Sequence, residues 1–236
     1  LCLFLPIEIV SVIGRIVIAC IFGIVLAFLF KELKLSPWWV FPVLLAYLRY
    51  DNLIAGEWII ASFETKSFAY CMALLALIMA LRCNYVLMAL FSGLALSFHV
   101  LVGFYALVTL VITIIGELLF SRNNRNILNE IELPKLEKIL ISIVCFFAAA
   151  SFGSAFLFNN FLNSLPVEHA RIASETYVIY RVPHHTLPYV WSYNFNIVKF
   201  IIIIFLFIGI WLVKIKKNSK SARLIFGYAL ATFIFA

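Results

Sequence analysis

The sequence predicts an all-α, polytopic integral membrane protein, and two observations predict it: the composition and the long apolar runs. Hydrophobic residues make up 65% of the 236 residues and charged residues 12%, and the mean hydropathy is +1.10. Soluble domains carry about 25% charged residues, so this chain cannot cover a water-exposed surface. Spanning helices need about 20 mostly apolar residues, and residues 7–30, 100–120, 139–158 and 200–213 supply such runs. Outer-membrane strands would alternate polar and apolar residues, which these runs do not.

In chain order, we expect seven to eight transmembrane or short membrane helices in a single domain that covers residues 1–236. The expected helices cover residues 7–30, 38–48, 67–81, 85–98, 100–120, 139–158 and 198–213, and a further helix begins at Leu224. An amphipathic stretch, residues 53–63, follows the second helix. The polar connections are residues 31–34, 121–138, 159–196 and 214–223.

Two of these helices are short. Residues 38–48 would extend about 16 Å at 1.5 Å per residue, which is too short to cross a bilayer. Either residues 49–54 extend this helix or the bilayer is thinner there. Residues 85–98 meet the same problem, so short helices are expected to be a feature of the fold.

The positive charges predict the orientation. We place residues 31–34, Arg82, residues 121–138 and residues 214–223 in the cytoplasm, where they collect twelve of the eighteen Lys and Arg residues. Five more lie on the opposite side and Arg15 lies within a helix, an asymmetry typical of multi-pass cell-membrane proteins. The 159–196 segment is therefore expected outside. Glu117, close to the cytoplasmic end of its helix, is interpreted as solvated.

Several function classes are excluded or disfavoured. The net charge of +7 is spread over short loops, so it does not indicate a nucleic-acid partner. The five cysteines are scattered without metal or disulfide spacing. The sequence has no Walker loop, dinucleotide fingerprint, HExxH motif or nucleophile elbow.

The first candidate site is Glu64, which comes just before helix 67–81. A carboxylate in a first turn is favoured by the helix dipole, so a simple structural anchor explains Glu64 equally well. The functional interpretation is a metal ligand or general base that faces an outer cavity, because ionisable groups at membrane depth are costly. Lys66, two residues on, is expected on a different helical face, where it does not neutralise Glu64 directly.

The second candidate is His99, between helices 85–98 and 100–120. Gly93 and Gly103 on either side permit close approach of helix backbones. A lone histidine is more often a structural residue than a ligand, but its place at a helix junction on the Glu64 side favours a functional role.

The third candidate is the segment Arg181-Val182-Pro183-His184-His185. Arginine offers a bidentate fork for phosphate, and imidazoles bind metals or phosphate. The neighbouring tyrosines and tryptophan are explained by an interfacial aromatic belt, but such a belt does not require Arg181, His184 and His185.

Three stretches resemble the GT-C superfamily of membrane glycosyltransferases, and more closely an uncharacterised GT-C-like family of bacterial membrane proteins. They are residues 63–70 (FETKSFAY) before an Arg-ended short helix, residues 92–103 (SGLALSFHVLVG) and residues 181–185 (RVPHH). In GT-C enzymes an acidic residue precedes such a helix on the outer face, and a Gly-Leu-Ala-type turn leads to a basic residue. Glu64 and His99 match these positions, and the resemblance covers residues 38–213.

The resemblance implies a glycosyltransferase that uses a polyprenyl-phosphate sugar donor on the non-cytoplasmic face. Glu64 and His99 would be catalytic, while Lys66, Arg181, His184 and His185 would bind the substrate. The cofactor stays open, with a divalent metal as one option, and the expected partners are membrane lipids. GT-C enzymes carry their principal acid in the first outer loop. Since the chain starts at Leu1 and stops at Ala236 inside apolar runs, we expect a fragment whose principal acid lies upstream.

Two other classes stay open. A transporter or channel subunit would usually show broken helices and internal repeats, and no convincing repeat is present. A non-enzymatic membrane scaffold is the third alternative. Solute flux distinguishes a transporter from a transferase, and the sequence upstream of Leu1 would show whether an outer-loop acid precedes it.

Overall fold

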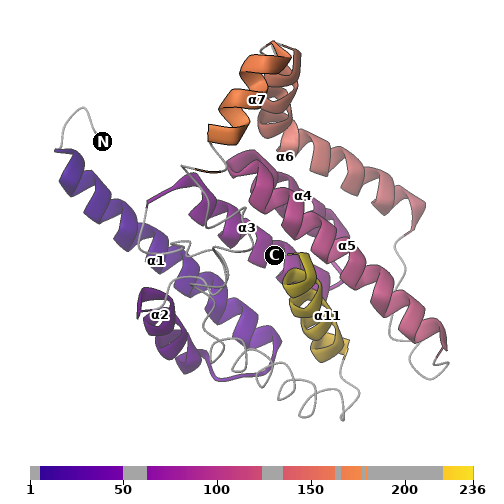
Figure 1. Cartoon of the computed structure of the whole chain (residues 1–236). Helices are drawn as coiled ribbons and strands as arrows, with labels where there is room; N and C mark the ends of the chain where they lie inside the picture. The colour runs from indigo at the N-terminus through magenta and orange to yellow at the C-terminus, as the bar shows by residue number, and fades with distance from the viewer. Residues whose placement is uncertain are drawn as a thin grey trace.

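The computed structural model describes residues 6–49, 63–123, 135–162, 166–176, 179 and 220–235. Within these ranges the chain is helical and contains no strand (Figure 1). The helices are α1 (Ile7–Glu32), the 3-10 turn η1 (Pro37–Trp39), α2 (Val40–Arg49), α3 (Thr65–Leu81), α4 (Tyr85–Phe98), α5 (Val100–Asn123), α6 (Leu136–Leu162), α7 (Val167–Thr176) and α11 (Lys220–Phe235).

Three of the described helices are long and apolar enough to cross a membrane: α1, the Val100–Leu119 part of α5 and the Leu136–Ala155 part of α6. Helices α3 and α4 are apolar but shorter, as the sequence predicted for residues 67–81 and 85–98. An all-helical chain with spanning-length helices is thus confirmed. The helix expected at residues 198–213 lies outside the described residues.

Some helix ends differ from the sequence prediction. Helix α5 continues to Asn123 and α6 already begins at Leu136, so the polar segment between them is shorter than the expected 121–138. Helix α7 lies within the segment 159–196, which was expected to be a loop. Helix α11 begins at Lys220 instead of Leu224, which removes Arg223 from the predicted cationic loop.

The helices pack in a row, α1 against α3, α3 against α4 and α4 against α6 (Figure 1). Helix α5 contacts α3 and α4, and α11 packs on α5. The main core lies between α1 and α3, where Ile18, Phe22, Ile78 and Met79 are buried. In a bilayer the gain from such a core comes from van der Waals packing between the helices, because lipid is as apolar as these side chains.

The segment after α1 turns back along it. Val40 and Leu44 of α2 lie beside Gly23 of α1, whereas the ring of Phe63 lies against Gly14. Nine residues of helix separate these two glycines, about 14 Å at 1.5 Å per residue. The expected extension of the 38–48 helix through residues 49–54 lies almost entirely outside the described residues.

Small residues allow α4 and α6 to approach closely. A Cβ atom at Gly93 would lie 2.5 Å from the carbonyl oxygen of Phe146, and one at Gly153 would lie 2.7 Å from that of Leu96. The Ser97 hydroxyl joins the two helices: it donates to the Ala149 carbonyl at 2.6 Å and accepts from the Gly153 N–H at 3.3 Å. This is the small-residue packing that membrane helices use, and it confirms the role expected for Gly93.

Helices α1 and α3 end in the same kind of turn. In each, a non-glycine residue adopts the left-handed region, Lys34 with φ 55° and Cys83 with φ 56°. In each, the next residue donates back into the helix, Leu35 to the Phe30 carbonyl and Asn84 to that of Met79. These are Schellman motifs, in which glycine is the favoured residue.

The two turns lie at one end of the bundle, which we call the Schellman end. Arg82, at the end of α3, forms an ion pair with Glu32, at the end of α1. Lys220, at the start of α11, donates to the sulfur of Cys83 at 2.9 Å. Three of the four segments that the charge pattern assigned to one side therefore share one end: residues 31–34, Arg82 and the start of α11.

Candidate functional site

Glu64 lies at the opposite end of the bundle, just before the first residue of α3. Its backbone is extended, with φ −129° and ψ 158°, and its carbonyl accepts from the Ser67 N–H at 3.1 Å. Its side chain forms no capping hydrogen bond and is 49% exposed. The carboxylate is therefore half exposed, and it does not cap the N-terminus of α3.

Lys66 lies directly against this carboxylate. Its Nζ is 3.0 Å from Oε2 of Glu64, and its side chain is only 16% exposed. The expectation that Lys66 would not neutralise Glu64 is wrong. The reason is that Glu64 has an extended backbone outside the helix, so the rule that residues two apart occupy different helical faces does not apply to it.

An aromatic chain connects the start of α3 with the end of α4. The rings of Phe63 and Phe68 meet edge to face with centroids 5.8 Å apart, and those of Phe68 and Phe98 stack at 5.5 Å. Because Phe63 precedes Glu64 and Phe98 precedes His99, both candidate residues belong to the same end of the bundle. We call it the Glu64 end, and it is the end opposite the Schellman turns.

His99 is the junction between α4 and α5. Its N–H donates to the Ala95 carbonyl at 3.0 Å, its carbonyl accepts from the Gly103 N–H at 2.8 Å, and its Nδ1 accepts from the Val102 N–H at 3.3 Å. The imidazole therefore caps the N-terminus of α5, a role usually taken by Ser, Thr, Asn or Asp. An accepting Nδ1 carries no proton, so the neutral ring has its proton on Nε2.

The predicted break at His99 is confirmed, and the close approach expected at Gly103 is present. A Cβ atom at Gly103 would overlap the backbone of Leu96. Only glycine fits here, since α5 folds back directly against the last turn of α4. Capping gives His99 a structural role, and its ring nevertheless stays at the Glu64 end.

The remaining predicted binding residues, Arg181, His184 and His185, lie outside the described residues. Their convergence with Glu64 and His99 stays a prediction. Within the described ranges, no three His, Cys, Asp or Glu side chains gather closely enough to hold a metal ion.

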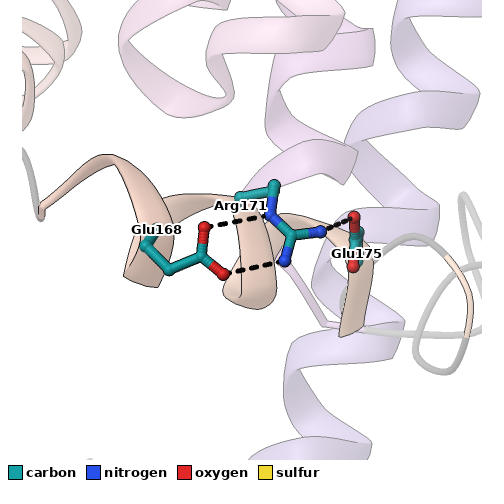
Figure 2. A network of polar contacts seen from close by, with 3 residues as sticks. All are labelled: Glu168, Arg171 and Glu175. Atoms are coloured by element: carbon teal, nitrogen blue, oxygen red, sulfur yellow. Dashed lines mark hydrogen bonds and ion pairs between the residues drawn. The ribbon is translucent and has the colours of Figure 1, made fainter.

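Helix α7 carries a polar network that the sequence analysis did not single out. Arg171 donates to both oxygens of Glu168, at 2.8 and 3.2 Å, and to Glu175 at 2.6 Å (Figure 2). Residues three and four apart share one helical face, and all three side chains are exposed. The Arg171 guanidinium lowers the pKa of the Glu168 carboxyl. The network stabilises an exposed helix.

The sequence analysis also missed a buried ion pair between α5 and α11. Arg223 Nε lies 3.0 Å from each carboxylate oxygen of Glu117, and its Nη2 lies 2.6 Å from Oε1. The side chains are 5% and 7% exposed. The interpretation of Glu117 as solvated is wrong because α11 covers it. Similarly, Arg223 is not a loop cation but lies in the first turns of α11.

One signal in the sequence could have indicated that Glu117 is buried. Thr109, Thr113 and Glu117 are spaced four residues apart, so they form one polar stripe on an otherwise apolar helix. All three are buried, and Thr113 lies against Gly227 of α11. A polar stripe on a membrane helix indicates a partner on that face.

The structure thus brings Glu64, Lys66 and His99 to one end of the bundle and places the buried Glu117–Arg223 pair between α5 and α11. Compared with protein-family models, with curated proteins and with solved structures, the chain gives no match.

Proposed function

We propose that this chain is the membrane-embedded part of a GT-C-like glycosyltransferase that takes its sugar from a polyprenyl-phosphate donor at the Glu64 end. One observation carries the proposal: a half-exposed carboxylate, a shielded ammonium and an imidazole-bearing helix junction share that end. Buried or interfacial ionisable groups in a membrane protein mark functional sites by default.

The Glu64–Lys66 pair has the two charges that such a transfer needs. The Lys66 ammonium attracts the phosphate of the donor. The phosphate then competes with the Glu64 carboxylate for Lys66. The carboxylate released in this way accepts the proton of the acceptor hydroxyl. That hydroxyl oxygen attacks the anomeric carbon of the sugar, and the bond from this carbon to the phosphate oxygen breaks, so polyprenyl phosphate leaves. Arg181, His184 and His185 would hold the phosphate and His99 would line the cavity.

The topology in this proposal follows the charge pattern. The Schellman end faces the cytoplasm, and the Glu64 end and residues 159–196 face the outside. Seven to eight membrane helices make up the whole domain. The donor enters laterally from the bilayer, beside the short helices α3 and α4, because a polyprenyl chain stays in the lipid.

The test is an assay of the full chain in lipid with a panel of polyprenyl-phosphate sugars. Glu64→Gln keeps the shape of the side chain and removes its charge, so it should lower turnover more than donor affinity. Arg181→Ala should weaken donor affinity about tenfold to hundredfold, since a charge-assisted hydrogen bond contributes roughly 1.5–3 kcal/mol. Glu168→Gln, an exposed carboxylate on α7, is the matched control and should change neither.

Two results would contradict the proposal. Wild-type protein that neither binds nor turns over any donor in the panel would remove the enzymatic function. Glu64→Gln protein with unchanged turnover would remove Glu64 from the site.

A transporter or channel subunit is the second candidate function, favoured by the buried Glu117–Arg223 pair. Ionisable residues between membrane helices often lie on an ion or substrate path. This function predicts solute flux in proteoliposomes that depends on Glu117, and no lipid-linked sugar turnover.

A further inference from the structure

The Schellman end presents two lysines that have no carboxylate partner among the described residues. Lys31 and Lys34 are exposed, and neither takes part in the ion pairs of the described chain. Their neighbour Glu32 is already paired with Arg82. Within the part of the chain that the structure describes, no carboxylate therefore neutralises Lys31 or Lys34.

This turn also carries two strongly exposed tryptophans. Trp38 is 74% exposed and Trp39 58% exposed, and the Trp38 ring stacks on Phe41 with centroids 5.8 Å apart. Tryptophan prefers the level of the lipid headgroups, where its ring is in an apolar layer and its N–H reaches water.

The length of α1 places this turn at the same level. Its 26 residues extend about 39 Å, which exceeds the roughly 30 Å hydrocarbon core of a bilayer. A helix of this length can carry its last turn beyond the hydrocarbon core, so that Lys31 and Lys34 reach the level of the lipid phosphates.

The backbone of Lys34 gives an independent argument. This residue occupies the left-handed position of the Schellman turn, where glycine is favoured and a side chain is strained. A lysine at this position costs stability that glycine would not. The presence of lysine at position 34 is therefore explained better by a contact that needs the charge of its ammonium group than by the geometry of the turn.

We propose that the α1–η1 turn is a binding site for the headgroup of an anionic phospholipid. Lys31 and Lys34 contact its phosphate, and Trp38 and Trp39 pack beside its glycerol region. The site lies at the end of the bundle opposite Glu64, so it is separate from the proposed donor site and does not depend on the proposed function.

The test measures lipid binding by native mass spectrometry of the full chain in a neutral detergent, titrated with phosphatidylglycerol or phosphatidylcholine. Each lysine near a membrane surface contributes about fivefold to anionic-lipid binding. Lys31→Gln with Lys34→Gln should therefore lower phosphatidylglycerol binding about twenty-five-fold and leave phosphatidylcholine binding unchanged. Lys135→Gln with Lys138→Gln, at two exposed lysines flanking the start of α6, removes the same charge away from the tryptophans and is the control; it should lower phosphatidylglycerol binding clearly less than the first pair.

Glycine substitutions separate the charge from the shape of the turn. Lys34→Gly should make the folded state about two- to fivefold more populated relative to the unfolded state, because it relieves a left-handed residue. The same variant should lower phosphatidylglycerol binding about fivefold. Cys83→Gly makes the equivalent change in the α3–α4 turn and should leave lipid binding unchanged.

Three results would overturn the proposal. The first is a double glutamine variant that keeps the preference for phosphatidylglycerol within twofold of wild type. The second is an equal loss in the Lys135 and Lys138 control, which would indicate a diffuse charge effect. The third is an equal loss in Cys83→Gly, which would mean that the turn geometry and not the lysine charge matters.

Discussion

Glu117→Gln is a direct perturbation of the contact that joins α11 to α5. Glutamine keeps the shape of the side chain but removes its negative charge. Arg223 cannot lose its proton, so in the variant a guanidinium that is 5% exposed stays charged without a counterion. Breaking a buried ion pair by removing one partner costs about 3–5 kcal/mol, so the variant should unfold more easily by that amount.

A second variant separates the loss of charge from the loss of packing. In Glu117→Leu with Arg223→Met, both charges are replaced by apolar side chains of similar length. Exchanging a buried ion pair for apolar residues is often neutral or stabilising by 1–4 kcal/mol. The double variant should therefore be at least as stable as wild type, although Glu117→Leu alone should be destabilised.

Two assays report these effects. Unfolding of the purified chain in mixed micelles gives the free energy. Contact between α5 and α11 is measured by oxidative cross-linking of Thr113→Cys with Gly227→Cys. A Cβ atom at Gly227 would lie 3.9 Å from that of Thr113, which suits a disulfide. Each single cysteine variant is the control for cross-links to native cysteines.

The cross-link should form readily with the ion pair intact and more slowly with Glu117→Gln. Two outcomes would refute the reasoning: a change in unfolding free energy below about 1 kcal/mol, which is the value of an exposed pair, or a double variant as unstable as Glu117→Leu.

Two further predictions concern the helix junction and the topology. His99→Ala should destabilise the chain by about 1 kcal/mol, since α5 loses its cap, whereas His99→Asn should keep most of that stability because asparagine is a good cap. Thermal unfolding of both variants measures this difference. Equal losses of stability in the two variants would mean that the Nδ1 contact with Val102 contributes little. Engineered cysteines in residues 159–196 should react with a membrane-impermeant reagent added outside intact cells, and those in residues 124–134 should not. The reverse pattern would mean that the bundle has the opposite orientation.

The sequence was sufficient for several features that depend on neighbouring residues. The bounds of α4 agree with the prediction at both ends, because Asn84 supplies a capping side chain, accepting from the Leu87 N–H at 3.2 Å, and His99 interrupts the apolar run. The close approach at Gly93 could be predicted because a glycine in a membrane helix indicates a neighbouring backbone. The charge pattern also grouped residues 31–34, Arg82 and the start of α11, which share one end of the bundle.

Contacts between distant residues needed the tertiary structure. Glu117 and Arg223 are 106 residues apart, and only the packing of α11 on α5 turns a carboxylate near a helix end into a buried one. Similarly, the Glu64–Lys66 contact depends on where α3 begins. If α3 began at Glu64, the side chains of Glu64 and Lys66 would lie on different faces of the helix. Helical periodicity gives the direction of a side chain once a helix is known, but the choice of neighbours and the first residue of each helix result from packing. The sequence by itself therefore determined the all-helical class, the spanning-length helices and the position of Glu64 and His99 at helix ends. The tertiary structure decided which of those residues meet.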